Sequence, residues 1–507
     1  MALPLFELVA ACIIAALVYY AVSAYTSPLS RIPNASFGAA VSRLAWALPQ
    51  EYNGTITLEL PKLHKKLGPL VRIGPNEISF YSREIYETVH KVGSKFKKDP
   101  RVYGEFVQGG HPALFSITDP VEHAKRRRIM AQLFSRSRVH QLEKLISYHV
   151  ERFIDKIRDG MSHVDLGMGA RALEADIMSD FSFGTVIQAV DSWASGEQLA
   201  MVEKNDEKAT WMPVLINFPS LCRLWEQIEE TLFHAIGWRS QYSKGLVDFN
   251  HWCRQSWRTA LSSESSVYTG NISSVNLIRT LCNAGLPEET ALSEASENLG
   301  PGTDTTSATL AHILWALAHN RSYQDALYQD LDIVSFATDM TTLEKIPRLQ
   351  ACVKEGIRWA GAAAAMLPRI VPPGGIELHN TFIPEGMVLT SSPIWYLHDS
   401  TAYLNPKLYD PYRWLTKDGK SLSEDRQRDW FYIPFSRGAN ICLGAHFSYL
   451  ELYVSVSQFV RNFRFEPLNP SQSIQDNKWN SILLPERKEW VAAVPVGKLK
   501  VITHLRR

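Results

Sequence analysis

Apolar and polar residues alternate with a helical period over most of the chain. Apolar positions three and four residues apart predict helices at residues 121–134, 139–157, 323–333, 347–359 and 445–463. A longer helix is predicted from about 286 to 319, because proline and two acids at its start suit a first helical turn. The pattern therefore predicts a mainly α protein.

Strand-like stretches are short. Residues 71–73 and 77–80 flank Gly74-Pro75-Asn76, which predicts a hairpin. Turn-forming and β-prone residues also gather at 370–389, and residues 490–504 alternate in the same manner. We expect a minor β part beside the helices.

The long helix carries an unusual segment at its centre. Gly300-Pro301-Gly302 is expected to break the helix, because proline lacks a hydrogen-bond donor and glycine adds backbone freedom. Hydroxyl and carboxyl groups follow at once in residues 303–306, where an opened helix would expose them. Two ordinary helices joined by a Gly-Pro turn with a polar cap are the alternative interpretation.

The first residues form an uncharged stretch. Between Glu7 and Arg31 lie 23 residues without a charge, enough to cross a hydrocarbon core of about 30 Å as a helix. A cleaved signal peptide is the alternative, but it would need a positive charge before the apolar stretch, and the first basic residue is Arg31. The sequence predicts a transmembrane anchor at 1–27.

The rest of the chain contains no repeat and no flexible linker that would divide it. Residues 28–50 are interpreted as a proline-containing linker, and residues 51–507 as one large domain. The 53 basic and 52 acidic residues nearly cancel, so the overall charge gives no reason to expect a nucleic-acid partner. Six scattered cysteines without a Cys-x-x-Cys pair do not indicate a zinc site or a disulfide framework.

One cysteine has a distinctive setting. Residues 435–444 read FSRGANICLG and precede the apolar helix predicted at 445–463. A cysteine at a helix N-terminus is favoured as a thiolate, which can bind iron, by the helix dipole and free N–H groups. Gly438 and Gly444 would let a flat cofactor approach the backbone near Cys442 closely.

These residues resemble the signature of the cytochrome P-450 family, Phe-x-x-Gly-x-basic-x-Cys-x-Gly. The family's other elements follow in its usual order: a basic helix motif, an oxygen-binding groove, Glu-x-x-Arg, and an arginine in a Pro-x-Arg-aromatic segment. The matching positions are His123 with Arg127, Gly302 to Thr306, Glu355 with Arg358, and Arg413. The likeness spans nearly the whole chain and is greatest to anchored filamentous-fungal members of secondary metabolism.

The resemblance implies a P-450 fold and a role for each matching residue. Cys442 would be the axial ligand of haem b, in a loop shaped by Phe435, Gly438 and Gly444. His123, Arg127 and Arg369 would contact the haem propionates. Asp304 and Thr305 would pass protons to oxygen as it is reduced. Glu355, Arg358 and Arg413 would form a structural ion network rather than a catalytic one.

Two positions depart from the family pattern. Asn440 stands where the family usually has a basic residue, so one propionate would lose a charged partner, and Arg127, His123 and Arg369 would have to compensate. Pro301 stands where the family usually has alanine or glycine. We expect weaker haem retention from the first change and a wider groove from the second.

The resemblance also implies partners and a location. Only 65 residues follow Cys442, too few for a flavin domain, so electrons are expected from a separate NADPH-cytochrome reductase. Lys125, Arg126 and Arg128 could dock that reductase, or could equally be solvated or bind haem. The expected location is the endoplasmic reticulum membrane, with a single span, lipid contact through the anchor and the catalytic domain in the cytosol.

The predicted function is hydroxylation or epoxidation of a lipophilic molecule with O2, for example a terpenoid, polyketide or alkaloid intermediate. Four stretches are expected to line the substrate pocket: residues 103–115, 212–218, 297–300 and 362–366. Two alternatives stay open at this point. The same fold could desaturate, couple or rearrange its substrate without inserting oxygen, or the chain could be a non-catalytic haem or ligand-binding protein.

Overall fold

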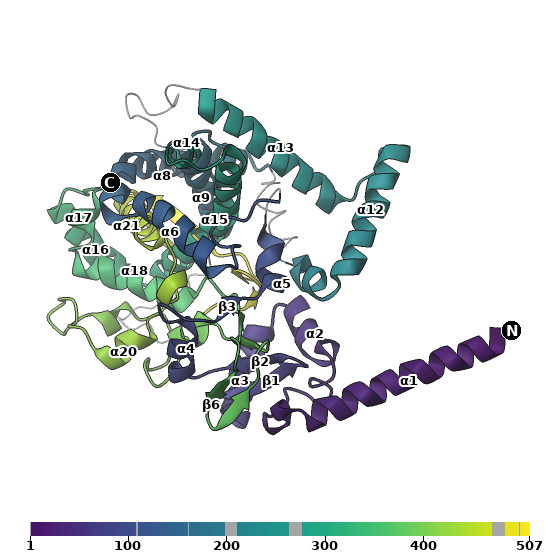
Figure 1. The fold of residues 1–507 in the computed structure, drawn as a ribbon. Coiled ribbons are helices and arrows are strands. Elements are labelled where there is room, and N and C mark those ends of the chain that lie inside the picture. The colour runs from purple at the N-terminus through teal and green to yellow at the C-terminus, as the bar shows by residue number, and fades with distance from the viewer. Residues whose placement is uncertain are drawn as a thin grey trace.

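Helices dominate the computed structural model, with small sheets along one side (Figure 1). The structure describes residues 2–107, 110–160, 162–197, 210–262, 276–468, 482–495 and 497–506. The first helices are α1 (Ala2–Thr26), α2 (Ala47–Tyr52), α3 (Ile56–Leu67), α4 (Arg83–His90), α5 (Pro100–Tyr103), α6 (Pro120–Leu133), α7 (Arg136–Val139), α8 (Glu143–Arg158), α9 (Leu166–Phe183) and α10 (Ala189–Ala194). The others are α12 (Pro219–Ile236), α13 (Gln241–Ser262), α14 (Leu277–Asn283), α15 (Glu288–Ala318), α16 (Arg321–Ile333), α17 (Met340–Leu343), α18 (Pro347–Ala360), α19 (Pro393–Leu397), α20 (Arg426–Phe431) and α21 (Ala445–Asn462).

The strands form four small sheets. The largest has the order β1-β2-β8-β5-β3 and joins segments far apart in the sequence, with β2 and β8 parallel and its other neighbours antiparallel. Its strands are β1 (Leu70–Gly74), β2 (Glu77–Phe80), β3 (Lys97–Lys98), β5 (Arg369–Ile370) and β8 (Val388–Thr390). The smaller sheets are β4 (His163–Asp165) with β12 (Lys500–Leu505) and β9 (Phe463–Pro467), β10 (Arg487–Glu489) with β11 (Ala493–Pro495), and β6 (Ile376–Leu378) with β7 (Thr381–Ile383).

The mainly α fold with a minor β part is confirmed, and so is the hairpin, whose Leu70 lies opposite Phe80. The helices predicted at 121–134, 323–333, 347–359 and 445–463 correspond to α6, α16, α18 and α21. The helix predicted at 139–157 begins later, at Glu143, because α7 and a short 3-10 helix occupy the residues before it.

The predicted break in the long helix is wrong. α15 runs without interruption from Glu288 to Ala318 and keeps Pro301 inside it. One proline removes one hydrogen bond, while the turns on both sides keep theirs and pack against α9. This packing is close, since a Cβ on Gly302 would lie 2.5 Å from Met178 Cε.

The apolar core that positions the site lies between α9, α15, α18 and α21. α15 passes through this core, and buried residues from all four helices pack around it. A second apolar cluster lies on the five-stranded sheet, where Leu29 and Ile32 pack with Ile78 and Phe80. Residues from the 28–50 segment also join the sheet edge, where Arg72 N donates to Pro33 O at 2.8 Å.

The segment predicted as a membrane anchor is helical and extends away from the rest of the chain as α1 (Figure 1). Among the residues that the structure describes, no helix combines the length and the apolar character needed to cross a membrane. The predicted transmembrane helix at 1–27 is therefore not supported.

Candidate functional site

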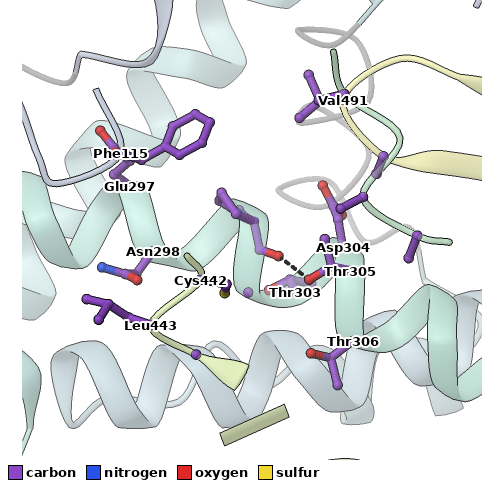
Figure 2. Close-up of a pocket in the computed structure, with 18 of the residues that line it drawn as sticks. Phe115, Glu297, Asn298, Thr303, Asp304, Thr305, Thr306, Cys442, Leu443 and Val491 are labelled. Atoms are coloured by element: carbon purple, nitrogen blue, oxygen red, sulfur yellow. Dashed lines mark hydrogen bonds between the residues drawn. The ribbon is translucent and has the colours of Figure 1, made fainter. Parts of the chain in front are cut away.

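A cavity of about 500 Å³ lies inside the helical core. Its walls come from the middle of α15, the loop before α21, α6 and the end of the large sheet. Figure 2 shows Cys442 and residues Thr303 to Thr306 of α15 among these lining groups. The cavity thus brings the cysteine loop together with the hydroxyl-rich segment of α15.

The cysteine loop is held by the backbone on both sides of Cys442. Cys442 N donates to Phe435 O at 2.9 Å, and Arg127 Nη1 donates to Ile441 O at 2.9 Å. Phe435, Cys442 and Gly444 line the cavity, and Cys442 is the one cysteine among the described lining residues. Cys442 is surrounded by protein atoms but keeps an exposed surface, and it lines this cavity.

Burial raises the pKa of the Cys442 thiol above its ordinary value, although the Gly444 N–H and the charge of Arg127 act in the opposite direction. The helix dipole and free N–H groups predicted a preference for the thiolate, and burial acts against that preference. Removal of the thiol from water outweighs the favourable dipole. A cation bound at the sulfur would supply the missing stabilisation, so this thiol fits an iron ligand.

Gly438 and Gly444 occupy different surroundings. Gly438 has φ +72°, and a Cβ there would lie 1.7 Å from His90 O at the end of α4. Gly438 is not among the described residues that line the cavity, so its missing side chain makes room for α4. Gly444 lies beside Cys442, and a Cβ there would be 3.8 Å from Cys442 Sγ.

Cations gather on one side of the cavity. The predicted residues His123, Arg127 and Arg369 all line it, and Arg369 Nη1 donates to Tyr103 Oη at 2.7 Å. Burial and the charges of Lys98, Arg127 and Arg369 lower the pKa of His123 to about 4. This crowding of positive charge fits an anionic group in the cavity, such as the propionates of haem.

Lys98 belongs to this group and was missed from the sequence. It is buried, lines the cavity, and donates from Nζ to Phe115 O at 2.8 Å. Burial and the charge of Arg369 lower its pKa to about 7. The only available signal was its place in strand β3, where Lys97 is exposed and Lys98 faces inward.

Asn440 also lines the cavity, and its buried Oδ1 has no hydrogen-bond partner among the described residues. The position that departs from the family motif therefore contributes no charge. Lys98 supplies an additional cation on the cavity wall, beyond the three residues expected to compensate.

The α15 residues predicted to move protons lie on the cavity wall. Thr305 Oγ1 donates to Pro301 O at 2.9 Å, the bond drawn dashed in Figure 2. Asp304 Oδ1 accepts from Arg171 Nη2 of α9 at 2.8 Å. Thr306 Oγ1 lies 3.1 Å from Ser448 Oγ of α21. Asp304 is therefore ion-paired, and the Thr305 hydroxyl is bound to its own helix.

The predicted ion network is assembled around a fully buried carboxylate. Arg358 Nη2 and Arg413 Nε donate to Glu355 Oε1 at 2.7 and 3.0 Å, and Trp414 Nε1 donates to Oε2 at 2.9 Å. Burial alone would raise the pKa of Glu355, but the two arginines outweigh it and hold the pKa below its ordinary value. The sequence did not indicate the part played by Trp414.

This network lies away from the cavity, because none of its charged members is among the described lining residues. Arg358 also donates to the carbonyls of Leu397, Pro406 and Leu408. The arginine therefore ties α18 to the last residue of α19 and to two points of the chain that follows it. This hydrogen-bonding geometry indicates that the network stabilises the fold.

All four stretches expected to line the substrate pocket contribute to the cavity. Its lining residues from them are Tyr103, Phe106, Leu114, Phe115, Met212, Glu297, Asn298, Leu299, Gly300, Ala362, Ala363 and Ala365. Residues 108 and 109 of the first stretch lie outside the described part of the chain. The aromatic and aliphatic side chains among these residues give the cavity an apolar wall where the four stretches line it.

Two buried acids in the wall were not anticipated. Glu297 accepts from Ser116 N and Oγ, and burial raises its pKa to about 7. Glu294 accepts from Arg126 Nη1 at 2.6 Å, so this arginine is turned inward while Lys125 and Arg128 remain exposed. Arg126 is therefore less available for a docking surface than its position in the basic run suggests.

Comparison with known proteins decides the family. The family model described as Cytochrome P450 matches residues 43–491, most of the chain. The chain belongs to the cytochrome P450 family. It is accordingly an oxygen-using monooxygenase that works with haem b bound through a cysteine thiolate, a reductase partner and a lipophilic substrate.

Several fungal P450 enzymes are similar over nearly their full length. Cytochrome P450 monooxygenase macH of Penicillium terrestre is 27% identical over 92% of this chain and 93% of its own. Fusicoccadiene C-8 hydroxylase of Alternaria brassicicola is 27% identical over 90% and 88%. Conidiogenone synthase PchP450 of Penicillium rubens is 25% identical over 86% and 87%. These relatives support a hydroxylating P450 of secondary metabolism.

Proposed function

We propose that Cys442 is the cysteine that binds the haem iron in this P450. The observation that carries this assignment is that Cys442 lines the same cavity as residues 303–306 of α15 and a group of cations. Phe435, Gly438 and Gly444 shape the loop that presents the sulfur. His123, Arg127 and Arg369, together with Lys98, bind the propionates.

The haem supplies oxygen activation and oxidation of the substrate. The chain's own residues control protons and access. Arg171 holds the Asp304 side chain in place, and the Thr305 hydroxyl can exchange its bond with Pro301 O for one directed into the cavity. Glu355, Arg358 and Arg413 hold the surrounding core and take no part in the reaction.

The substrate is a lipophilic molecule, for which we propose a terpenoid, polyketide or alkaloid intermediate of a fungal pathway. Support comes from the apolar wall formed by Phe106, Phe115 and Met212, and from relatives named as a fusicoccadiene C-8 hydroxylase and a conidiogenone synthase. The preferred reaction is hydroxylation or epoxidation.

Metabolite profiling of a deletion strain tests this function, because the intermediate that accumulates identifies the substrate. The purified enzyme, a reductase and NADPH should then convert that intermediate with incorporation of one labelled oxygen atom from O2. A product without the label would indicate desaturation, coupling or rearrangement. NADPH consumption that the substrate does not stimulate would contradict an enzymatic role.

Thr305→Ala is expected to divert electrons from product to hydrogen peroxide. The substitution removes the hydroxyl at the cavity wall but leaves the cysteine loop and the cations unchanged. We expect several-fold more peroxide for each NADPH consumed, with substrate binding close to that of the wild type. Peroxide and product are measured together, and Thr305→Ser serves as the control that retains the hydroxyl.

We further propose single-pass attachment of α1 to the endoplasmic reticulum, with the catalytic domain facing the cytosol. Supporting this, α1 extends from the body and exposes Ile14, Val18 and Val22. Alkaline carbonate washing of microsomes should leave the full chain in the membrane pellet and release a variant lacking residues 1–27. Release of the full chain by the wash would contradict a membrane span.

A further inference from the structure

Two glutamates meet inside the core behind α15. Glu174 lies on α9 and Glu451 on α21, and their exposed fractions are 0% and 1%. No ion pair with a described cation includes either carboxyl group. Two negative charges at this place would be unusually costly, because neither water nor a cation would offset them.

Their hydrogen bonds suggest how this cost is avoided. Both oxygens of Glu174 and Oε1 of Glu451 have no conventional donor among the described residues. Each carboxyl is nevertheless within hydrogen-bonding reach of the other. Ionised carboxylates only accept hydrogen bonds, whereas a protonated one can donate to its neighbour. A proton between the two groups would satisfy oxygens that otherwise have no donor.

The electrostatics agree with this geometry. Burial raises the pKa of Glu174 to about 8, and burial together with the charge of Glu174 raises that of Glu451. Burial is the largest influence on both groups, and the one influence from outside the pair that opposes it is the hydroxyl of Thr306 on α15. Interacting acids of this kind titrate as one unit.

The pair is connected to the cavity by hydroxyl groups. Thr306 lies near enough to Glu451 for its hydroxyl to lower the pKa of that carboxyl group, and Thr306 Oγ1 is 3.1 Å from Ser448 Oγ. Thr306, Ser448 and Glu451 line the cavity, whereas Glu174 does not. This chain of polar groups is separate from the Asp304 carboxylate, which Arg171 neutralises.

We propose that Glu174 and Glu451 share one proton in the folded enzyme and deliver protons to the cavity through the hydroxyl of Thr306. In this transfer Glu451 gives its proton to the Thr306 oxygen, while the Thr306 hydroxyl proton passes to oxygen undergoing reduction. The pair then recovers a proton from bulk solvent, which water in the cavity relays without itself losing a proton overall. The sharing of the proton stands alone, but its delivery rests on the proposed function.

Infrared difference spectroscopy of the purified haem protein tests the shared proton. At pH 7 the wild type should show a protonated-carboxyl stretch that shifts in heavy water. Glu174→Gln and Glu451→Gln should each remove the same component of this band, because an amide can donate in place of the proton and leave the remaining carboxylate ionised. The component from Glu297, whose pKa is about 7, should remain in both variants. Asp180→Asn, another buried acid on α9, should retain the band. A wild type without the band overturns the proposal.

The pH dependence of unfolding gives an independent test. The unfolded glutamate releases its proton near its ordinary pKa of 4.5, whereas folded Glu174 retains it to about 8. The unfolded state therefore binds fewer protons between these values, and stability should fall as the pH rises through this window. Glu174→Gln should flatten the fall relative to Asp180→Asn. An unchanged pH dependence contradicts a proton held by the pair.

Turnover tests the delivery of the proton. Glu174→Gln leaves the cavity wall intact, so haem content and substrate binding should be unchanged. We expect several-fold slower product formation, a larger solvent isotope effect and more peroxide for each NADPH than in Asp180→Asn. Wild-type values for all three would overturn delivery even if the infrared band is present. Absence of any turnover in the wild type would instead contradict the proposed function.

Discussion

Cys442→Ser is expected to abolish both the thiolate-specific absorption of the reduced, carbon monoxide-treated enzyme and its turnover. Serine cannot provide the sulfur that donates electron density to the haem iron. The cations on the cavity wall remain, so some haem can still bind without the correct ligand. The red-shifted Soret band and product formation should therefore disappear together.

Cys282→Ser provides the matched control, because Cys282 lies on α14 and does not line the cavity. This variant should keep the absorption and the activity of the wild type. If Cys442→Ser retained the red-shifted band, the assignment of the ligand would be incorrect. The same would hold if Cys282→Ser lost it.

Glu355→Ala should lower the free energy of unfolding by about 3–5 kcal/mol, which is a large part of the stability of a typical domain. The substitution leaves Arg358 buried without its carboxylate and removes the acceptor of Arg413 and Trp414. Urea unfolding followed by tryptophan fluorescence measures the loss. Little folded protein at 37 °C is also expected.

Glu59→Ala is the control for this loss. Glu59 pairs with Lys62 on the surface, where both side chains are well exposed. Exposed pairs contribute up to about 1 kcal/mol, so this variant should unfold nearly as the wild type does. Equal free energies of unfolding for Glu355→Ala and Glu59→Ala would show that the buried network does not stabilise the fold.

Much of the fold follows from local patterns. α16, α18 and α21 were predictable because each keeps an apolar face over several turns, and the hairpin because Gly74 and Pro75 favour a turn. The interruption expected at Pro301 did not occur, because α15 packs closely on α9 at this point, with Gly302 against Met178. This packing stabilises the helix across the proline. The pattern of neighbouring residues cannot predict a contact between residues so far apart in the sequence.

The functional site was likewise predictable where local motifs define it and not where long-range contacts do. Motifs in the sequence indicated Cys442, Thr305 and Glu355, because each lies in a segment with a distinctive pattern. Hydrogen-bond partners from distant segments could not be predicted from the sequence. For example, Arg171 pairs with Asp304, which lies 133 positions later in the chain. Lys98 lies in no motif that the sequence analysis identified, and only the inward direction of its side chain in strand β3 places it on the cavity wall.

The ion network has a consequence for biosynthesis. α18 leaves the ribosome carrying Glu355 and Arg358, but Trp414 is synthesised 59 positions after Glu355, and Arg413 just before it. Until those residues emerge, the Glu355 carboxylate lacks two of its hydrogen-bond donors. Burying it would then cost free energy, so it is expected to stay in contact with water. A nascent chain that stops short of residue 414 should therefore remain open to proteases, and the helical core should close only late in translation.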